Sequence, residues 1–501
     1  MFNQILKHLS CFKAVTDQDK DREGEGDTNI LKSNIYESHQ HKRACPYLYK
    51  DVLCVIFKYL TLSELVKAGH VNKNWFYTSI NIPSRNDYLK YATPKTAYKA
   101  ISSKYGYYIN KANFGIGMSS KDVNNIVNFI KHGISLRSLR LDHSKFTNDD
   151  IKIISQAIEK NSSITHIDFS YSGLKCKGVS SIIRAIEQNP SITSVNLESN
   201  NELGDEAAIA FTGVINHNRN LKFIDLSGCS ITDDGAILLA LAISKNKTIT
   251  SINLSYNMIE EKSIMYLANA VKDHPSITLL DLSYTLPTQE SIKAICHSIE
   301  KSQIMTSLVM KGVDIGSNLN NIKSITSIIE HNPYINFVDL SWNKIKHDGA
   351  KIIATCLSNN FTITSINLGS NKFRGEALKI LSCMIKNSKS LLSLDLSNNL
   401  LDDQDAKCIS ESIEKSVSVT TINLKNNCIT YKGAQFLSRA ISKSSTLVSL
   451  NLRGNNIGKE GHQSISNGVS QNTVNNNIIR VLIELQLENC RIDAVVSSFL
   501  K

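Results

Sequence analysis

The feature that most constrains this chain is a short apolar pattern that returns at an almost constant interval over most of its 501 residues. The pattern is Leu-x-x-Leu-x-Leu, and we align it on its last leucine-type residue, the anchor. Successive anchors are 28, 28, 29, 28, 28, 28, 30, 28, 28, 28, 28 and 35 residues apart. They are Leu141, Phe169, Leu197, Leu226, Leu254, Leu282, Met310, Leu340, Leu368, Leu396, Leu424, Leu452 and Leu487. This register predicts a repeat protein in which each unit packs only on its neighbours.

Each unit predicts one strand followed by one helix. In residues 390–399 (SLLSLDLSNN) the leucines alternate with Asp395 and Ser397, as in a half-buried strand. A helical stretch such as residues 350–360 (AKIIATCLSNN) follows. Parallel strands lie about 4.8 Å apart, whereas packed helix axes need about 8–10 Å. We therefore expect an α/β horseshoe with strands on its concave wall and helices on its convex wall.

A polar residue ends most of these strands, three positions past the anchor. In seven units this residue is an asparagine: Asn200, Asn257, Asn343, Asn371, Asn399, Asn427 and Asn455. An amide there can donate to and accept from backbone groups of neighbouring turns, which predicts a hydrogen-bonded ladder. Cys229 and Cys490 take the same place in two other units. Val313, the 30-residue unit near Asn318 and residues 470–479 depart from the pattern, so we expect irregular loops there.

The period and the Leu-x-x-Leu-x-Leu-x-x-Asn core resemble the ribonuclease-inhibitor subtype of leucine-rich repeats, over about residues 133–492. The resemblance implies a horseshoe that binds protein. We assign residues 133–501 to an array of about thirteen units. Residues 86–132 are expected to form a helical linker and N-terminal cap, including a helix within 121–134 (KDVNNIVNFIKHGI). Residues 1–44 form an expected flexible leader, with a short amphipathic helix at 2–13.

A smaller domain of three short helices is predicted at residues 45–85. Its pattern of Leu48, Asp51, Leu53, Ile56, Phe57, Leu60, Leu65, Val71 and Trp75 resembles the F-box. Tyr49 stands where that family usually has proline, and Asn72 where cysteine is common. The alternative is an ordinary helical cap of the array.

The F-box resemblance implies a docking surface for the Skp-family adaptor of cullin-RING ubiquitin ligases. Its adaptor-binding residues would be Leu48, Leu53, Ile56, Phe57, Leu60, Leu65, Val71 and Trp75. For each of them, the alternative role is the core of the small domain itself.

Candidate target-binding residues can be placed on the expected concave face. Large aromatic residues lie two positions past the anchor or on neighbouring concave positions, with two basic residues as a margin. They are Tyr171, Phe223, Tyr256, Tyr284, Phe337, Trp342, Lys425 and Arg453. Exposed aromatic residues are enriched at protein interfaces, although side-by-side packing on a curved sheet is the alternative explanation. A second row, of Asp and Asn between the last two core leucines, is expected to stabilise neighbouring strands.

No motif for catalysis, metal binding or a cofactor is found in the sequence. Residues 454–461 (GNNIGKEG) resemble a phosphate-binding loop but have the wrong spacing, and Glu460 stands where Ser or Thr is needed. The net charge of +11 is not concentrated in a nucleic-acid motif, and no apolar run is long enough to span a membrane. The 11 cysteines lack C-x-x-C spacing, which favours a reducing compartment such as the cytoplasm, and possible nuclear residence stays open. Cys296, Cys356, Cys383 and Cys408 are predicted core residues.

These observations predict a non-enzymatic adaptor. Its F-box would dock a Skp-family adaptor, and through it a cullin-RING ligase, while the horseshoe recruits a protein target for ubiquitination. The alternative is a ligase-independent interaction or inhibitory scaffold. Either protein could act in its own cytoplasm or, as an effector, in the cytosol of a host cell.

Overall fold

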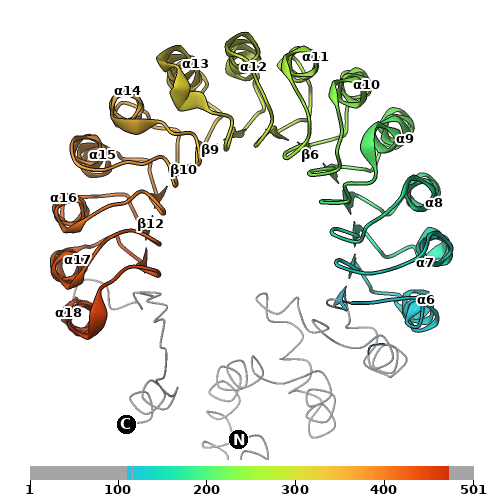
Figure 1. Cartoon of the computed structure of the whole chain (residues 1–501), viewed down its shortest axis with the longest axis horizontal. Coiled ribbons are helices and arrows are strands. Elements are labelled where there is room, and N and C mark those ends of the chain that lie inside the picture. Colours follow the sequence, from blue (N-terminus) through green and yellow to red (C-terminus); the bar gives the residue numbers. More distant parts are fainter. Residues whose placement is uncertain (1–96, 98–109, 115–116, 473–501) are drawn as a thin grey trace, which may run out of the picture. The chain divides into compact units, whose positions relative to one another are not determined.

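The computed structural model describes residues 97, 110–114 and 117–472, which form a curved array of strand–helix units (Figure 1). Strands line the inner side of the arc and helices line its outer side, which confirms the predicted horseshoe. The leader (1–44), the F-box segment with its predicted adaptor-binding residues (48–75) and the last anchor, Leu487, lie outside the described residues.

The strands form one parallel sheet whose order follows the sequence, from β1 to β13. Each strand is three residues long and precedes its anchor. The strands are β1 (Lys111–Asn113), β2 (Ser138–Arg140), β3 (His166–Asp168), β4 (Ser194–Asn196), β5 (Phe223–Asp225), β6 (Ser251–Asn253), β7 (Leu279–Asp281), β8 (Ser307–Val309), β9 (Phe337–Asp339), β10 (Ser365–Asn367), β11 (Ser393–Asp395), β12 (Thr421–Asn423) and β13 (Ser449–Asn451).

One helix follows each strand, and its apolar side packs on the sheet. The helices are α6 (Val123–His132), α7 (Asn148–Lys160), α8 (Cys176–Gln188), α9 (Gly204–His217), α10 (Asp233–Ile243), α11 (Glu261–Lys272), α12 (Gln289–Lys301), α13 (Leu319–His331), α14 (Lys346–Ser358), α15 (Glu376–Asn387), α16 (Asp403–Ile413), α17 (Tyr431–Lys443) and α18 (Gly458–Gln471). A short 3-10 helix, η4 (Ile315–Ser317), precedes α13. Several helices begin at a capping box, as at Thr147 and Asp402.

The core is a continuous apolar layer between sheet and helices. In the β6 unit, Ile249, Ile252 and the anchor Leu254 are all buried, while Ser251 and Asn253 are half-buried on the inner face. The middle residue of every other strand is buried in the same way, and the residues beside it are more exposed, except for the buried Asp225 in β5. No unit could bury this much apolar surface alone, so stacking supplies the stability.

The predicted asparagine ladder is confirmed. Asn257 donates through Nδ2 to the carbonyls of Leu226 (2.8 Å) and Leu254 (2.9 Å). Its Oδ1 accepts from the backbone N–H groups of Cys229 (3.1 Å) and Ile231 (2.9 Å). One buried amide thus satisfies four backbone groups of two successive turns, which would otherwise be costly to bury.

A second ladder, which was not predicted, runs along the carboxyl ends of the helices. Asn189 donates through Nδ2 to the carbonyls of Ile158 (2.7 Å) and Asn161 (2.6 Å). In the β7 unit His274 takes this place: its Nδ1 faces the N–H groups of Ser276 (3.2 Å) and Ile277 (3.1 Å). The Nε2 of His274 lies 3.2 Å from the carbonyl of Ile243, so the neutral imidazole with its proton on Nε2 fits all three partners.

The structure departs from the regular predicted repeat pattern at two places. Strand β1 lies within the segment predicted to be linker and cap, and Phe114 occupies the anchor position there, 27 residues before Leu141. The predicted helix after it is α6, in which Phe129 meets Phe114 edge to face at 5.2 Å. The expected irregular loop near Asn318 is confirmed by η4, and between β7 and β8 only Asp281 and Val309 stay in paired register.

The cysteine prediction was half right. Cys296 and Cys356 are buried, and burial raises the pKa of each thiol to about 12. Cys383 is exposed and Cys408 is half-buried, so these two do not belong to the core. In α16 the other apolar residues, Ala406, Ile409 and Ile413, are all buried, and Cys408 lies beside that buried side.

Candidate protein-binding surface

The loops that lead from each strand to its helix share a strained backbone position, two residues past the anchor. Every residue there from β2 to β13 has a positive φ. They are His143, Tyr171, Ser199, Gly228, Tyr256, Tyr284, Gly312, Trp342, Ser370, Asn398, Asn426 and Gly454. Glycine and asparagine tolerate this left-handed conformation, but bulky residues there are genuine outliers.

Four of the predicted target-binding residues occupy this position. Tyr171, Tyr256, Tyr284 and Trp342 have φ values of 55°, 57°, 56° and 63°. Their loops lie at the carboxyl edge of the sheet, so these side chains are next to the strands and not on them. Tyr171, Tyr256 and Trp342 are 47%, 59% and 54% exposed, and Tyr284 is half-buried.

Tyr256 and Tyr284 are brought together from neighbouring loops. Their rings stack with centroids 4.2 Å apart and planes 19° from parallel. The Lys311 ammonium lies 5.4 Å from the Tyr284 ring centroid, within cation–π range. Burial raises the pKa of the Tyr284 phenol well above its usual value, and the neighbouring Tyr256 side chain adds to this effect. Tyr284 therefore stays a neutral hydrogen-bonding aromatic group.

Tyr171 stacks on a residue that the sequence analysis missed. The His143 and Tyr171 rings are 4.6 Å apart and only 7° from parallel. The Tyr171 hydroxyl donates to Glu198 Oε1 at 2.9 Å, and His143 Nδ1 lies 3.0 Å from Asp142. His143 holds the same position after its anchor as Tyr171, so the repeat register could have identified it.

Two exposed aliphatic residues extend the Tyr256–Tyr284 stack and were also missed. Met258 and Leu286 lie four positions past their anchors and are 54% and 64% exposed. They follow the two tyrosines in the same loops, so two neighbouring loops carry four apolar side chains, Tyr256, Met258, Tyr284 and Leu286. A single exposed apolar residue is ordinary, whereas a cluster of this kind marks an interaction surface.

The remaining predicted residues are placed elsewhere. Phe223 begins β5 and Phe337 begins β9, both half-buried on the inner face of the sheet. Lys425 and Arg453 lie one position past their anchors, after β12 and β13. They are three and four strands beyond Trp342, about 14 Å or more away at the usual strand spacing, and so are not its neighbours.

The Asp and Asn row on the inner face is structural, as predicted. Asn253 donates through Nδ2 to Asp225 Oδ2 at 2.9 Å, and Asn367 donates to Asp339 Oδ2 at 2.9 Å. Each pair links two adjacent strands. Asp281 has no such asparagine partner, because its neighbour on the next strand, β8, is Val309. Burial raises the pKa of the Asp281 carboxyl above its usual value.

Comparison with known proteins decides the nature of these units. A family model described as "Leucine Rich repeat" matches residues 188–211, 217–240, 331–354, 387–410, 415–438 and 443–466. These segments are leucine-rich repeats. The matched segments are spread over the array and share its strand–helix plan. Among the curated proteins, no match is found.

Solved structures that are similar to the leucine-rich-repeat array include three different proteins. The actin-binding site 2 of leiomodin-1 is 21% identical, with a TM-score of 0.26, and the match covers 29% of this chain and 86% of that one. A chain of the Rad7 and Elc1 complex in yeast is 12% identical, with a TM-score of 0.39, covering 80% and 94%. An internalin of Listeria monocytogenes is 14% identical, with a TM-score of 0.29, covering 68% and 81%. None of these likenesses carries an argument about function.

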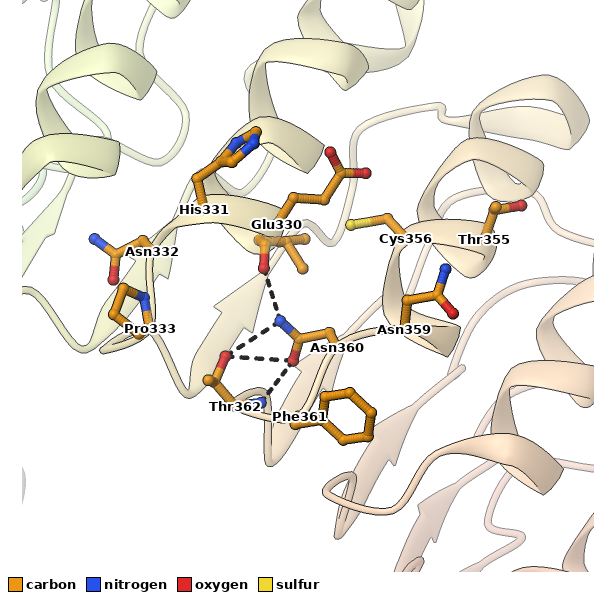
Figure 2. Close-up of a pocket in the computed structure, with 11 residues that line it drawn as sticks. Glu330, His331, Asn332, Pro333, Thr355, Cys356, Asn359, Asn360, Phe361 and Thr362 are labelled. Atoms are coloured by element: carbon orange, nitrogen blue, oxygen red, sulfur yellow. Dashed lines mark hydrogen bonds between the residues drawn. The ribbon is translucent and has the colours of Figure 1, made fainter.

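A pocket of about 440 Å³ lies at the opposite edge of the leucine-rich repeats, between the ends of α13 and α14 (Figure 2). Several of its polar groups form hydrogen bonds with backbone groups of neighbouring repeats. Asn360 donates through Nδ2 to the carbonyl of Ile329 at 2.7 Å and accepts from the N–H of Ile363 at 2.7 Å. The Cys356 thiol in its wall donates to the carbonyl of Thr326 at 3.6 Å. We assign this pocket a structural role.

Within the part of the chain that the structure describes, no group of three or more His, Cys, Asp or Glu side chains could hold a metal ion. Likewise, no described helix has the length and apolarity that crossing a bilayer requires. The exposed aromatic loops are thus the candidate site that the described residues support best.

Proposed function

We propose that the leucine-rich-repeat array captures a protein on its strand–helix loops and inner face. The observation that carries this proposal is the pair of stacked tyrosines, Tyr256 and Tyr284, with Trp342 nearby in left-handed loop positions. Serine, asparagine or glycine fills the same position in other repeats, so the fold does not require an aromatic residue there. A bulky side chain in this conformation costs about 1–2 kcal/mol. Binding supplies a reason for retaining it.

The inner face supports the same proposal. Phe223, Leu279 and Phe337 begin strands β5, β7 and β9, where most other strands begin with serine or threonine. All three are half-buried, so part of each side chain remains open to a partner. Large, rigid aromatic side chains bury much area while losing few rotamers, which suits a protein interface.

A finer function follows from the sequence of residues 45–85. Their resemblance to the F-box supports docking of a Skp-family adaptor, with Ile56 and Phe57 among the contacts. The chain would then join a cullin-RING ligase to the protein held by the repeats. It would accelerate ubiquitination by proximity, because holding a target near the enzyme raises the effective concentration of its lysines.

A second candidate function is a repeat scaffold that acts without a ligase. Tyr49 favours it, because proline is usual at that place in the F-box family. Both candidates need the target-binding surface, and only the first needs adaptor binding. Adaptor binding therefore separates them.

The target-binding surface can be tested by the triple replacement Tyr256→Ser/Tyr284→Ser/Trp342→Ser. A protein partner isolated on the wild-type chain should bind the triple variant roughly 100-fold more weakly, because buried aromatic anchors dominate interface energies. Serine already occurs at this loop position, so the fold should be retained, as circular dichroism would show.

A control variant removes three exposed apolar side chains from the helices instead. Ile209→Ser/Leu238→Ser/Tyr266→Ser changes three exposed residues of α9, α10 and α11 on the outer side. This variant should bind the partner as the wild type does. Equal loss of binding in both variants, or unchanged binding in the loop variant, would refute the assignment.

A further inference from the structure

A basic area directly continues the aromatic loops toward the C-terminal repeats. The loops after β9 and β10 carry Lys344, Lys346, Lys372 and Arg374, all exposed. Lys344, Lys346 and Lys372 have φ values of 54°, 58° and 61°, so three more non-glycine residues hold left-handed conformations. The loop after β9 thus presents both an apolar group, Trp342, and positive charge, and the loop after β10 continues the positive charge.

We call this surface the loop strip and define it by two halves. The apolar half comprises Tyr256, Met258, Tyr284, Leu286 and Trp342. The basic half comprises Lys344, Lys346, Lys372 and Arg374.

Backbone hydrogen bonds join the loops of the strip into one surface. Tyr256 N donates to Ser283 O at 2.9 Å, and Tyr284 N donates to Lys311 O at 2.8 Å. Trp342 N continues the series toward the next loop by donating to the carbonyl of Gly369 at 3.0 Å. From the β6 loop to the β10 loop there are four strand steps of about 4.8 Å, or about 19 Å. That is the length of about six residues of extended chain.

The charge of the strip is mainly positive. In positions one to six past the anchors that follow β6 to β10, five side chains are basic and two are acidic. The basic ones are Lys311, Lys344, Lys346, Lys372 and Arg374, and the acidic ones are Glu260 and Asp314. Asp314 pairs with Lys344 at 3.2 Å, but both side chains stay more than half exposed, so the pair is weak in water. An excess of positive potential therefore faces the solvent here.

We propose that the loop strip binds an acidic segment of the protein partner, extended over about six residues. Aliphatic or aromatic residues of that segment would lie on the tyrosines, Met258 and Leu286. Its carboxylates would follow toward Lys344 and Lys372. The inference rests on the proposed capture of a protein and adds the chemistry and the direction of the captured segment.

An acidic protein segment fits this surface better than single-stranded nucleic acid does. Nucleic-acid platforms use open aromatic faces on which bases stack. Here Tyr256 and Tyr284 lie face to face at 4.2 Å, which leaves no room for a base between them. The exposed side chains of Met258 and Leu286 offer apolar contact but no flat surface. Apolar anchors beside a charged margin are typical of protein interfaces.

The test begins with the full chain and a displayed library of random twelve-residue peptides. Peptides enriched on the wild type should combine apolar residues with at least two acidic residues. One enriched peptide, fluorescently labelled, is then titrated against the variants by anisotropy. The charge reversal Lys344→Glu/Lys372→Glu should weaken its binding roughly tenfold. The control reversal Lys247→Glu/Lys389→Glu changes two exposed lysines at the opposite edge and should leave binding unchanged.

Several results would overturn the inference. They are enrichment of basic or uncharged peptides, enrichment of nothing, equal loss of binding in both reversals, or tighter binding of a labelled oligothymidylate than of the peptide. The two proposals can also be told apart. If the variant Tyr256→Ser/Tyr284→Ser/Trp342→Ser loses the protein partner but Lys344→Glu/Lys372→Glu retains it, the array captures a protein but does not bind it through an acidic segment.

Discussion

At the scale of single residues, Gly312 explains how an aromatic stack fits on the strained loops. It occupies the same loop position as Tyr284 in the next repeat, with a φ of +64°. A Cβ at Gly312 would lie 2.4 Å from Cε1 of the Tyr284 ring. Gly173 has a similar φ of +58° but nothing within 4 Å of the same point. Of these two glycines, Gly312 is the one that provides space for a neighbouring ring.

This difference predicts the behaviour of two alanine variants. Gly173→Ala should lower the free energy of unfolding by about 1 kcal/mol, the cost of a left-handed alanine. Gly312→Ala should lower it by a further 1–3 kcal/mol or so, because Tyr284 must also move. Urea unfolding of the two variants measures the difference. Equal shifts would show that the Tyr284 ring does not lie over Gly312.

A second residue-scale prediction concerns His274 in the helix-end ladder. Burial lowers its pKa below the ordinary value of 6.5. The unfolded chain therefore takes up the proton first as the pH falls, and the stability that neutral His274 contributes is present above about pH 6.5 and lost below it. Asparagine fills the equivalent place at Asn246, so His274→Asn should remove this dependence between about pH 7 and about pH 5.

The control for His274 is an exposed histidine of the next helix. His297→Asn makes the same substitution, histidine to asparagine, at an exposed position of α12. This variant should leave the pH dependence of unfolding as in the wild type. If both variants shift the profile equally, His274 is not the titrating group.

At the scale of elements, the 28-residue register was enough to predict strands, helices and the first asparagine ladder. Strand β1 was missed because Lys111–Asn113 has only Ala112 and then Phe114 to indicate it. The second ladder was missed although Asn161 and Asn189 are also 28 residues apart. The spacing of these asparagines was therefore sufficient to predict the second ladder.

The first ladder makes an element-scale prediction through Asn343. Its Nδ2 donates to the carbonyls of Met310 (2.6 Å) and Leu340 (3.1 Å), and its Oδ1 accepts from the N–H groups of Val313 (3.0 Å) and Ile315 (3.3 Å). Asn343→Ala leaves these buried groups unpaired and should lower the free energy of unfolding by about 3 kcal/mol.

Asn201 provides the comparison for Asn343. It is exposed in a turn, and Asn201→Ala should change the free energy of unfolding by less than about 0.5 kcal/mol. Urea unfolding followed by far-ultraviolet circular dichroism checks both variants. A small effect of Asn343→Ala would mean that the ladder does not tie the β8 and β9 units together.

The candidate site was only partly predictable for a physical reason. Aromatic periodicity identified Tyr256, Tyr284 and Trp342, but their left-handed backbone could not be foreseen, because such turns are normally indicated by glycine or asparagine. Met258 and Leu286 were passed over because apolar residues near a strand suggest core, and exposure depends on the direction of the loop. The basic half of the strip could not be predicted from the sequence, because its lysines and arginine come together only when the repeats stack.

At the scale of the whole molecule, binding and support are assigned to different edges of one array. The carboxyl ends of the strands carry the strained aromatic and basic loops, and the helix ends carry the buried ladder and the pocket around Asn360. A stack in which each repeat contacts only its neighbours can hold such a surface rigid over several repeats. Docking of a ligase adaptor is proposed for a separate segment, residues 45–85.

The measurement that tests this account most directly is a pull-down of a purified Skp-family adaptor on the wild-type chain and on Ile56→Asp/Phe57→Ala. The control is the loop variant Tyr256→Ser/Tyr284→Ser/Trp342→Ser, which leaves the F-box segment intact. We predict that the wild type and the loop variant retain the adaptor and that the Ile56/Phe57 variant loses it, since a charge in an apolar anchor site is costly. A folded wild-type chain that retains no adaptor would contradict the ligase assignment.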